Sequence, residues 1–212
     1  MRKYAIFAVL LISAQAFAEC GKDSTWTKYV KGEFFTTTTT VVNSDFSSAQ
    51  SVVNEFVRQF NNDFGKLFTW TFKDIGKQKE AEKDAFYLDI KSSEFDKMTG
   101  VTTFTADILV SGTRRFKDVI ISCKITQIGN NKTHSSVFVD IFYSNMLLKK
   151  AYGTIFVEKC NNREIKISVS VSVRFGWFFN IFITKKVYKD VIEWRLTKIA
   201  QNFKEEVEKN SK

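Results

Sequence analysis

The sequence predicts an α+β protein in which a curved antiparallel sheet of about seven or eight strands packs against a long C-terminal helix. Hydrophobic residues alternate with a period of two over most of the chain, which is typical of strands with one buried face. One helical stripe interrupts this alternation after the first strand, and a longer helical stripe ends the chain. With 212 residues and no proline, residues 19–212 are expected to form a single domain.

The first 18 residues have the pattern of a cleaved signal peptide. A basic start, "MRK", precedes the apolar run "YAIFAVLLI", and the segment Ala16-Phe17-Ala18 matches the small-x-small motif of signal peptidase sites. The apolar run is shorter than the ~20 residues that a membrane-spanning helix needs. We therefore expect cleavage after Ala18 and export to a periplasm or to the cell exterior.

The mature chain is basic, but its charges are scattered. Removing the leader takes away Arg2 and Lys3 and lowers the net charge from +9 to +7, with 30 basic residues against 23 acidic ones. A charge of this size keeps a small domain soluble, and the alternative is attraction to an anionic envelope surface. No basic stripe is interleaved with aromatic residues, so a nucleic-acid partner is not expected.

The first part of the domain predicts one strand and one helix. Residues 27–42, "TKYVKGEFFTTTTTVV", are rich in β-branched and aromatic residues and predict a long strand. In the helix that follows, Ser47 and Gln50 fit a capping box, and Gly65 is placed to end it. Its apolar face consists of Ala49, Val53, Phe56, Val57, Phe60 and Phe64.

The alternating region predicts an antiparallel meander that a second helix closes. Short turns separate strands near residues 66–74, 84–93, 101–111, 115–127, 134–144, 150–158 and 163–175. The last strand should bury Ile165, Ile167, Val169, Val171, Val173 and Phe175. The terminal helix, about 184–209, has a stripe formed by Tyr188, Ile192, Leu196, Ile199, Phe203 and Val207.

This order of elements resembles the helix-grip fold of the START and Bet v 1-like superfamily, over nearly the whole mature chain. That superfamily usually has two helices after its first strand and seven strands, whereas this sequence predicts one helix and one more strand. Another curved-sheet α+β fold, such as the half-barrel carriers of the bacterial envelope, is therefore the alternative. The resemblance implies an apolar cavity between the sheet and the terminal helix that holds lipids, sterols or other apolar molecules.

The sequence contains few patterns of catalytic residues. His134 is the only histidine, and Cys123 is in phase with the buried positions of its strand, so we expect a buried thiol and no Cys–His pair. No spacing fits a metal site, a phosphate loop or a serine-hydrolase elbow, and the sequence predicts no cofactor and no enzyme activity. If a disulfide forms, Cys20–Cys160 is the more accessible pair.

Two acidic residues interrupt the strand patterns. Asp107 lies in "FTADILV" and Asp140 lies in "VFVDIFY". We expect Asp140 to point outward, because a buried carboxylate without a partner is costly. The alternative is a polar group inside an apolar cavity, where it would orient a ligand head group.

The segment "FGWFFNIFI", residues 175–183, joins the last strand to the terminal helix and is unusually aromatic. It is too short to span a membrane. A wider core is one interpretation, and a pocket mouth, a membrane-dipping tip and a homodimer face are the others. The terminal helix carries a second apolar face at Val187, Val191 and Trp194, which favours contacts on two sides.

These patterns predict an exported, non-enzymatic binding or carrier module for an apolar or lipid-like ligand. The candidate ligand-binding residues are Trp177, Phe178, Phe179, Phe182, Tyr188, Ile192, Leu196 and Ile199. The alternative is an envelope interaction or structural protein with a filled core. In that case residues 177–194 would form an aromatic contact patch for a partner or for a second copy of the chain.

Overall fold

A computed structural model describes residues 20–71, 73, 87–110, 114–146, 148–176 and 184–211. The predicted signal peptide, residues 1–18, and the aromatic segment at 177–183 lie outside this range. Within it the strands form one eight-stranded antiparallel sheet, and the predicted α+β class is confirmed. The elements are β1 (Ser24–Val30), β2 (Glu33–Asn43), α2 (Phe46–Asn62), α3 (Phe64–Thr71), β3 (Tyr87–Asp96), β4 (Val101–Val110), β5 (Arg114–Asn130), β6 (His134–Ser144), β7 (Leu148–Lys159), β8 (Glu164–Phe175) and α5 (Lys185–Asn210).

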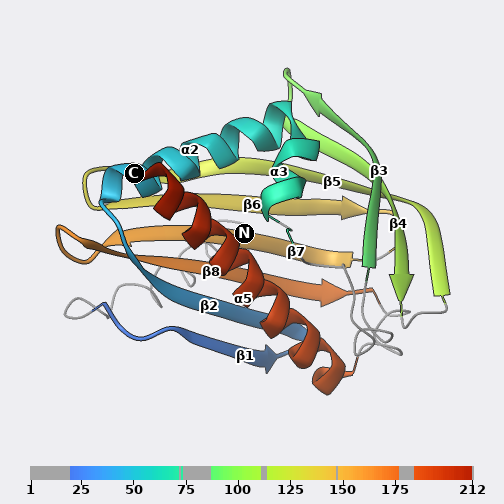
Figure 1. Ribbon diagram of the computed structural model, residues 1–212. Coiled ribbons are helices and arrows are strands. Elements are labelled where there is room, and N and C mark those ends of the chain that lie inside the picture. The colour runs from blue at the N-terminus through green and yellow to red at the C-terminus, as the bar shows by residue number, and fades with distance from the viewer. Residues whose placement is uncertain are drawn as a thin grey trace.

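The sheet curves around α5, which crosses its concave face diagonally (Figure 1). The strand order is β1-β2-β8-β7-β6-β5-β4-β3, so the last strand pairs with β2. The predicted inward row of β8 lies on the concave face, with Val171 half-buried and the other five residues buried. On α5, Tyr188, Leu196, Phe203 and Val207 are buried, as the predicted stripe requires.

The predicted long strand at 27–42 is two strands joined by a tight turn. Lys31 and Gly32 have φ angles of 50° and 83°, and Val30 pairs with Glu33 across the turn. A two-residue loop with positive φ at both positions matches the twist of a β-hairpin. The turn was missed because lysine rarely occupies such a position, and because the flanking residues favour strands on both sides.

The predicted strand at 66–74 is wrong, because α3 occupies Phe64–Thr71. Asp63 caps this helix: the Lys66 backbone N–H donates to Asp63 Oδ1 at 3.0 Å. Leu67 and Thr71, one helical turn apart, are the buried residues. Gly65 therefore lies inside α3 rather than ending the first helix. The two helices in succession match the usual pattern of the helix-grip fold.

The first helix begins at a different cap from the one predicted. Asp45, not Ser47, is the N-cap, and its Oδ1 accepts the Ser48 backbone N–H at 2.9 Å. The Ser48 hydroxyl also donates to Asp45 Oδ2 at 2.8 Å. Hydrogen bonds from Ser47 and Ser48 lower the pKa of Asp45 to about 2, so this cap remains charged across the neutral range.

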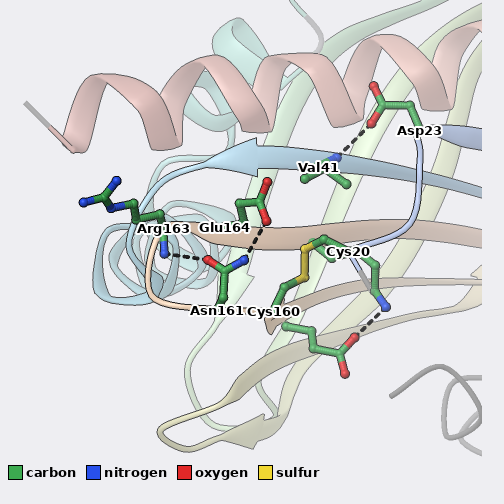
Figure 2. Close-up of a disulfide and its surroundings, with 9 residues drawn as sticks. Cys20, Asp23, Val41, Cys160, Asn161, Arg163 and Glu164 are labelled. Carbon is green, nitrogen blue, oxygen red and sulfur yellow. Dashed lines mark hydrogen bonds and ion pairs between the residues drawn. A yellow bond between two sulfur atoms is a disulfide. The ribbon is translucent and has the colours of Figure 1, made fainter. Parts of the chain in front are cut away.

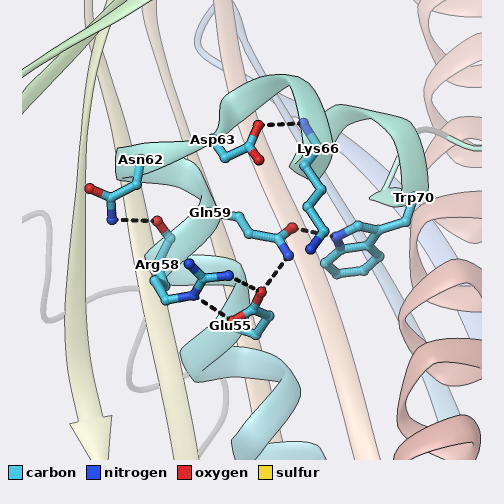
Figure 3. A network of polar contacts seen from close by, with 7 residues as sticks. All are labelled: Glu55, Arg58, Gln59, Asn62, Asp63, Lys66 and Trp70. Carbon is cyan, nitrogen blue, oxygen red and sulfur yellow. Dashed lines mark hydrogen bonds and ion pairs between the residues drawn. The ribbon is translucent and has the colours of Figure 1, made fainter.

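A polar network fixes α3 against α2 (Figure 3). The Trp70 indole N–H donates to Gln59 Oε1 at 2.8 Å, and the Gln59 amide donates in turn to Glu55. Arg58 forms an ion pair with the same Glu55 carboxylate. Gln59 is buried, so these bonds satisfy an amide that would otherwise destabilise the helix pair.

A disulfide joins Cys20 to Cys160, as the sequence suggested (Figure 2). It ties the segment before β1 to the turn between β7 and β8. Nearby, the Val41 backbone N–H donates to Asp23 Oδ1 at 2.8 Å. Cys123 is buried, as predicted, and burial raises the pKa of its thiol to about 12.

Asp107 anchors the region where three neighbouring strands are irregular. The register shifts between Ile90 and Ser92 on β3 and between Ala106 and Ile108 on β4. The Asp107 side chain is only 3% exposed. It accepts Lys91 Nζ at 2.6 Å, Arg115 Nη2 at 2.7 Å and the Asp118 backbone N–H at 3.0 Å. Asp140, in contrast, is exposed and points outward as expected.

Acid should weaken this anchor in a defined pH range. The hydrogen bond from Lys91 is the main cause that lowers the pKa of Asp107 from 3.8 to about 2. A carboxylate with a lowered folded-state pKa stabilises the fold above its unfolded pKa and loses that effect as the pH falls through the folded value. We therefore expect Asp107→Asn to destabilise the protein near neutral pH, and the difference to shrink towards about pH 2.

Urea denaturation of the unaltered protein and of Asp107→Asn, near neutral pH and again at about pH 2, measures this difference in stability. Asp140→Asn is the matched control, since Asp140 is exposed. If Asp107→Asn lowers the free energy of unfolding by the same amount at both pH values, the carboxylate charge does not stabilise the irregular region of β3 and β4.

Candidate functional site

Apolar residues that remain half-buried line the concave face of the sheet. The strand pairings align Val139 on β6, Gly153 on β7, Val171 on β8 and Thr36 on β2 in one row across the sheet. Directly paired residues of antiparallel strands share a face. Val139 and Val171 pack against the buried core but keep part of their surface exposed. We call Val139, Gly153 and Val171, together with Ile192 of α5, the Gly153 surface.

Gly153 leaves space at the centre of this row. A Cβ atom built on Gly153 would come within 4 Å of one group only, the carbonyl oxygen of Ser170, at 3.6 Å. Among the described residues, no side chain of α5 or of a neighbouring strand comes within 4 Å of this Cβ position. The flanking inward residues of β7, Ala151 and Ile155, are buried. Within the described part of the chain, the concave face thus has a gap at Gly153 between two buried positions.

The contacts of α5 place Ile192 opposite this row. Tyr188 stacks on Phe34, which lies on β2 two residues before Thr36, and the ring centroids are 3.9 Å apart. Thr197 forms a 3.1 Å hydrogen bond with Thr25 of β1. Thr25 pairs with Thr38, which lies on β2 two residues after Thr36. The helical turn between these two contacts contains Ile192, and Ile192 is only half-buried.

Tyr188 brings a polar group to the same region. The residue is 5% exposed, and its hydroxyl has no hydrogen-bond partner of normal geometry among the described residues. The Thr36 hydroxyl, which also bonds to Thr27 at 2.9 Å, is the polar group that approaches the Tyr188 hydroxyl. Burial raises the pKa of Tyr188 to about 12, so the hydroxyl keeps its proton at neutral pH. It can donate a hydrogen bond to an oxygen of a bound molecule.

The structure describes four of the eight sequence-predicted ligand residues. Tyr188, Ile192, Leu196 and Ile199 all lie on the face of α5 that packs on the core. Leu196 is fully part of that core, whereas Ile192 and Ile199 keep partly exposed surface. The other four, Trp177, Phe178, Phe179 and Phe182, lie outside the described residues and stay predictions.

Two hollows of the described surface are lined by residues other than those of the Gly153 surface. One, of about 190 Å³, lies between the β1–β2 hairpin and α5 and is lined mainly by hydroxyl-bearing and amide side chains, among them Thr25, Thr38 and Gln201. The other, of about 410 Å³, is lined by residues of β3 to β6, including Glu94, Asp96 and Phe142. The first hollow reaches the concave face at Thr38 and Thr40 of β2.

The groups with reactive side chains are not brought together. Cys123 lies in the core opposite Ile141, whereas His134 begins β6 at the other end of that strand and stacks on Phe156. In the part of the chain that the structure describes, no cluster of three or more metal-ligating side chains occurs. The described helices include none that is long and apolar enough to cross a membrane.

Comparisons with known proteins identify the fold. No protein-family model and no curated protein sequence matches the chain. Among solved structures, a START superfamily protein from Mycobacterium smegmatis aligns over 82% of this chain and 97% of its own, with a TM-score of 0.51 and 10% identity. The chain has the START/Bet v 1-like fold.

Two other structures with the START/Bet v 1-like fold extend the comparison. The Zhui aromatase/cyclase from Streptomyces sp. R1128 aligns over 85% of this chain and 96% of its own, with a TM-score of 0.54 and 7% identity. A conserved protein from Geobacillus kaustophilus aligns over 84% and 97%, with a TM-score of 0.53 and 11% identity. At these identities the likeness concerns the fold alone.

Proposed function

We propose that this protein binds an apolar or lipid-like molecule between the concave face of its sheet and α5, as a binding or carrier module without catalysis of its own. The gap at Gly153 carries the proposal, because an unfilled position among half-buried apolar residues offers contact area to an apolar ligand. Tyr188 supplies one polar group that would orient the ligand. The START/Bet v 1-like fold supports this placement of the site.

The absence of catalysis is part of the proposal rather than a consequence of the fold. One protein of similar structure is an aromatase/cyclase, so the fold is compatible with enzymes. In this chain His134 lies on a strand end, far from the thiol of Cys123 and from the Gly153 surface. We therefore assign binding, and not a reaction, to the concave face.

We also propose that the protein is exported, to a periplasm or to the cell exterior, with the leader removed after Ala18. The disulfide between Cys20 and Cys160 supports this location, since disulfides persist in oxidising compartments. Sequencing the N-terminus of the mature protein tests the cleavage site.

Filling the gap should abolish ligand binding without unfolding the protein. In Gly153→Leu, the new side chain would occupy the space above Gly153, whose φ angle is not positive. We expect the affinity for a neutral naphthylamine probe to fall by roughly tenfold or more, because the lost apolar contact area is comparable to one large side chain. A fluorescence titration measures the affinity, and a thermal melt follows the fold.

Thr154→Leu is the matched control, because it adds the same side chain to the convex side of the same strand. It should bind the probe as the unaltered protein does. Equal probe binding by both variants would show that ligands do not use the Gly153 surface. A Gly153→Leu protein that unfolds would show that the position has no free space, and this too would contradict the proposal.

The alternative function, an envelope interaction or structural protein, is favoured by one observation. Trp194 is 39% exposed on α5, inside the predicted contact patch at 177–194. A large exposed aromatic side chain is a common anchor in protein interfaces. Native mass spectrometry separates the two functions: a co-purifying apolar molecule supports the carrier, and a ligand-free homodimer supports the interaction protein.

A further inference from the structure

One end of the sheet combines exposed lysines with exposed apolar side chains. The β1–β2 turn and the start of α5 lie side by side there (Figure 1), and Lys185 Nζ sits 4.3 Å from the centre of the Tyr29 ring. We call this region the lysine tip. Its exposed residues are Lys28, Tyr29, Val30, Lys31, Lys185, Lys186 and Lys189.

The lysine tip has an excess of positive charge. Within the described part of the chain, none of its five ammonium groups pairs with a carboxylate. The nearest acid on β2, Glu33, is already bonded to Ser172 and lies 3.8 Å from Lys150. In the first turns of α5 the acids are Asp190, which is exposed, and Glu193, which is half-buried. Five cations thus face two carboxylates, an excess of positive charge that favours an anionic partner.

The apolar residues of the tip indicate what kind of anion this is. Tyr29 is 44% exposed and Val30 is 50% exposed, directly beside the turn residues Lys31 and Gly32. A soluble polyanion would use the lysines but would gain little from an exposed valine. At a bilayer, apolar side chains enter the boundary between head groups and acyl chains while lysines stay with the phosphates. Charge and exposed apolar surface together fit an anionic phospholipid surface.

We propose that the lysine tip docks the protein on an anionic phospholipid bilayer. This proposal goes beyond ligand binding and does not require it. The docked tip would hold the first turns of α5 at the membrane, because Lys185, Lys186 and Lys189 all belong to those turns. Tyr188 lies in the same turns, on the buried side of the helix. Docking would therefore bring the Tyr188 end of the concave face close to the lipid.

Co-sedimentation with vesicles tests the proposal on the complete mature chain. The protein should bind vesicles that mix phosphatidylglycerol with phosphatidylcholine, and should bind pure phosphatidylcholine weakly. Replacing Lys185, Lys186 and Lys189 together with glutamine should weaken binding by roughly a hundredfold, because each lysine near an anionic surface contributes about fivefold. Val30→Ser should weaken it by roughly tenfold through lost apolar burial.

The matched control replaces Lys22, Lys132 and Lys159 with glutamine. These lysines are equally exposed, and their segments lie at the opposite end of the sheet, near the Cys20–Cys160 disulfide and the β5–β6 turn. If this control loses as much binding as the tip variant, the contact is general charge attraction and the proposal is wrong. If Val30→Ser binds vesicles normally, the tip does not enter the bilayer and the proposal is also wrong.

Naphthylamine binding separates this proposal from the carrier function. The lysine variants leave the Gly153 surface unchanged, so they should keep their affinity for the probe. If the unaltered protein binds the probe but does not bind the phosphatidylglycerol vesicles, the docking tip is refuted and the carrier function is not. Thermal melts of all variants should match the unaltered protein, since every substituted residue is exposed.

Discussion

Replacing Cys20 and Cys160 together with serine should lower the free energy of unfolding by about 3–5 kcal/mol. The disulfide links residues that are 140 positions apart, so the unfolded chain regains a large loop-closure entropy when the bond is absent. The double replacement avoids leaving one reactive thiol. Urea denaturation without reductant measures the loss, and the same experiment on the unaltered protein with reductant should reproduce it.

Reductant itself provides the internal control for this experiment. Cys123 is buried and does not take part in a disulfide, so reductant should have no effect on the double variant. If reduction of the unaltered protein leaves its urea midpoint unchanged, the Cys20–Cys160 bond does not stabilise the fold. The disulfide would then attach the segment before β1 to the domain without stabilising it.

Replacing Phe203 with alanine should cost about 3–5 kcal/mol. Phe203 is completely buried where α5 meets α2 and α3. Its ring centroid lies 5.3 Å from that of Phe56 on α2 and 4.9 Å from that of Trp70 on α3. Truncation would remove these aromatic contacts and leave a cavity that the three helices cannot easily close.

Gln201→Ala is the matched control for Phe203→Ala. Gln201 is exposed on the same helix two residues away, so its replacement should change the free energy of unfolding by less than about 0.5 kcal/mol. Chemical denaturation of both variants gives the comparison. A similarly small loss for Phe203→Ala would mean that the C-terminal half of α5 does not hold the helix layer to the sheet.

Elements with strong periodicity were predictable from the sequence. The inward row of β8 and the buried stripe of α5 each repeat one pattern over more than three turns or pleats, and burial imposes that pattern directly. The burial of Cys123 followed from the same logic. The resemblance to the helix-grip fold depended on these elements and was confirmed.

Elements decided by a few backbone angles were not predictable in the same way. The β1–β2 turn depends on positive φ at Lys31 and Gly32, and a Lys-Gly pair gives only a weak signal for it. In "KLFTWTFKD" the alternation of apolar residues and threonines favours a strand, yet Asp63 starts a helix there. Burial of Leu67 against the core decided between the two.

The candidate site was predictable only on the helix side. Tyr188 and Ile192 follow from the stripe of α5, but the sheet side depends on register between strands far apart in sequence. Gly153 was visible as a glycine within a strand pattern, which marks a bulge or a close approach. Nothing in the sequence shows that Val139 and Val171 lie beside it. The sequence singled out Asp107 but not its partners, because Lys91 and Arg115 come from two other strands.

The pairing of β2 with β8 has a consequence for how the chain folds during synthesis. Thr37 and Ser170, which are bonded across this ladder, are 133 residues apart, so one edge of β2 stays unpaired until nearly the whole chain has been made. An exposed strand edge is a template for aggregation. The threonine run at 36–40 keeps the branched side chains that favour a strand and replaces apolar surface with hydroxyl groups. While β8 has not yet been synthesised, a strand of this composition is less prone to pair with another chain than a strand of valine and isoleucine would be.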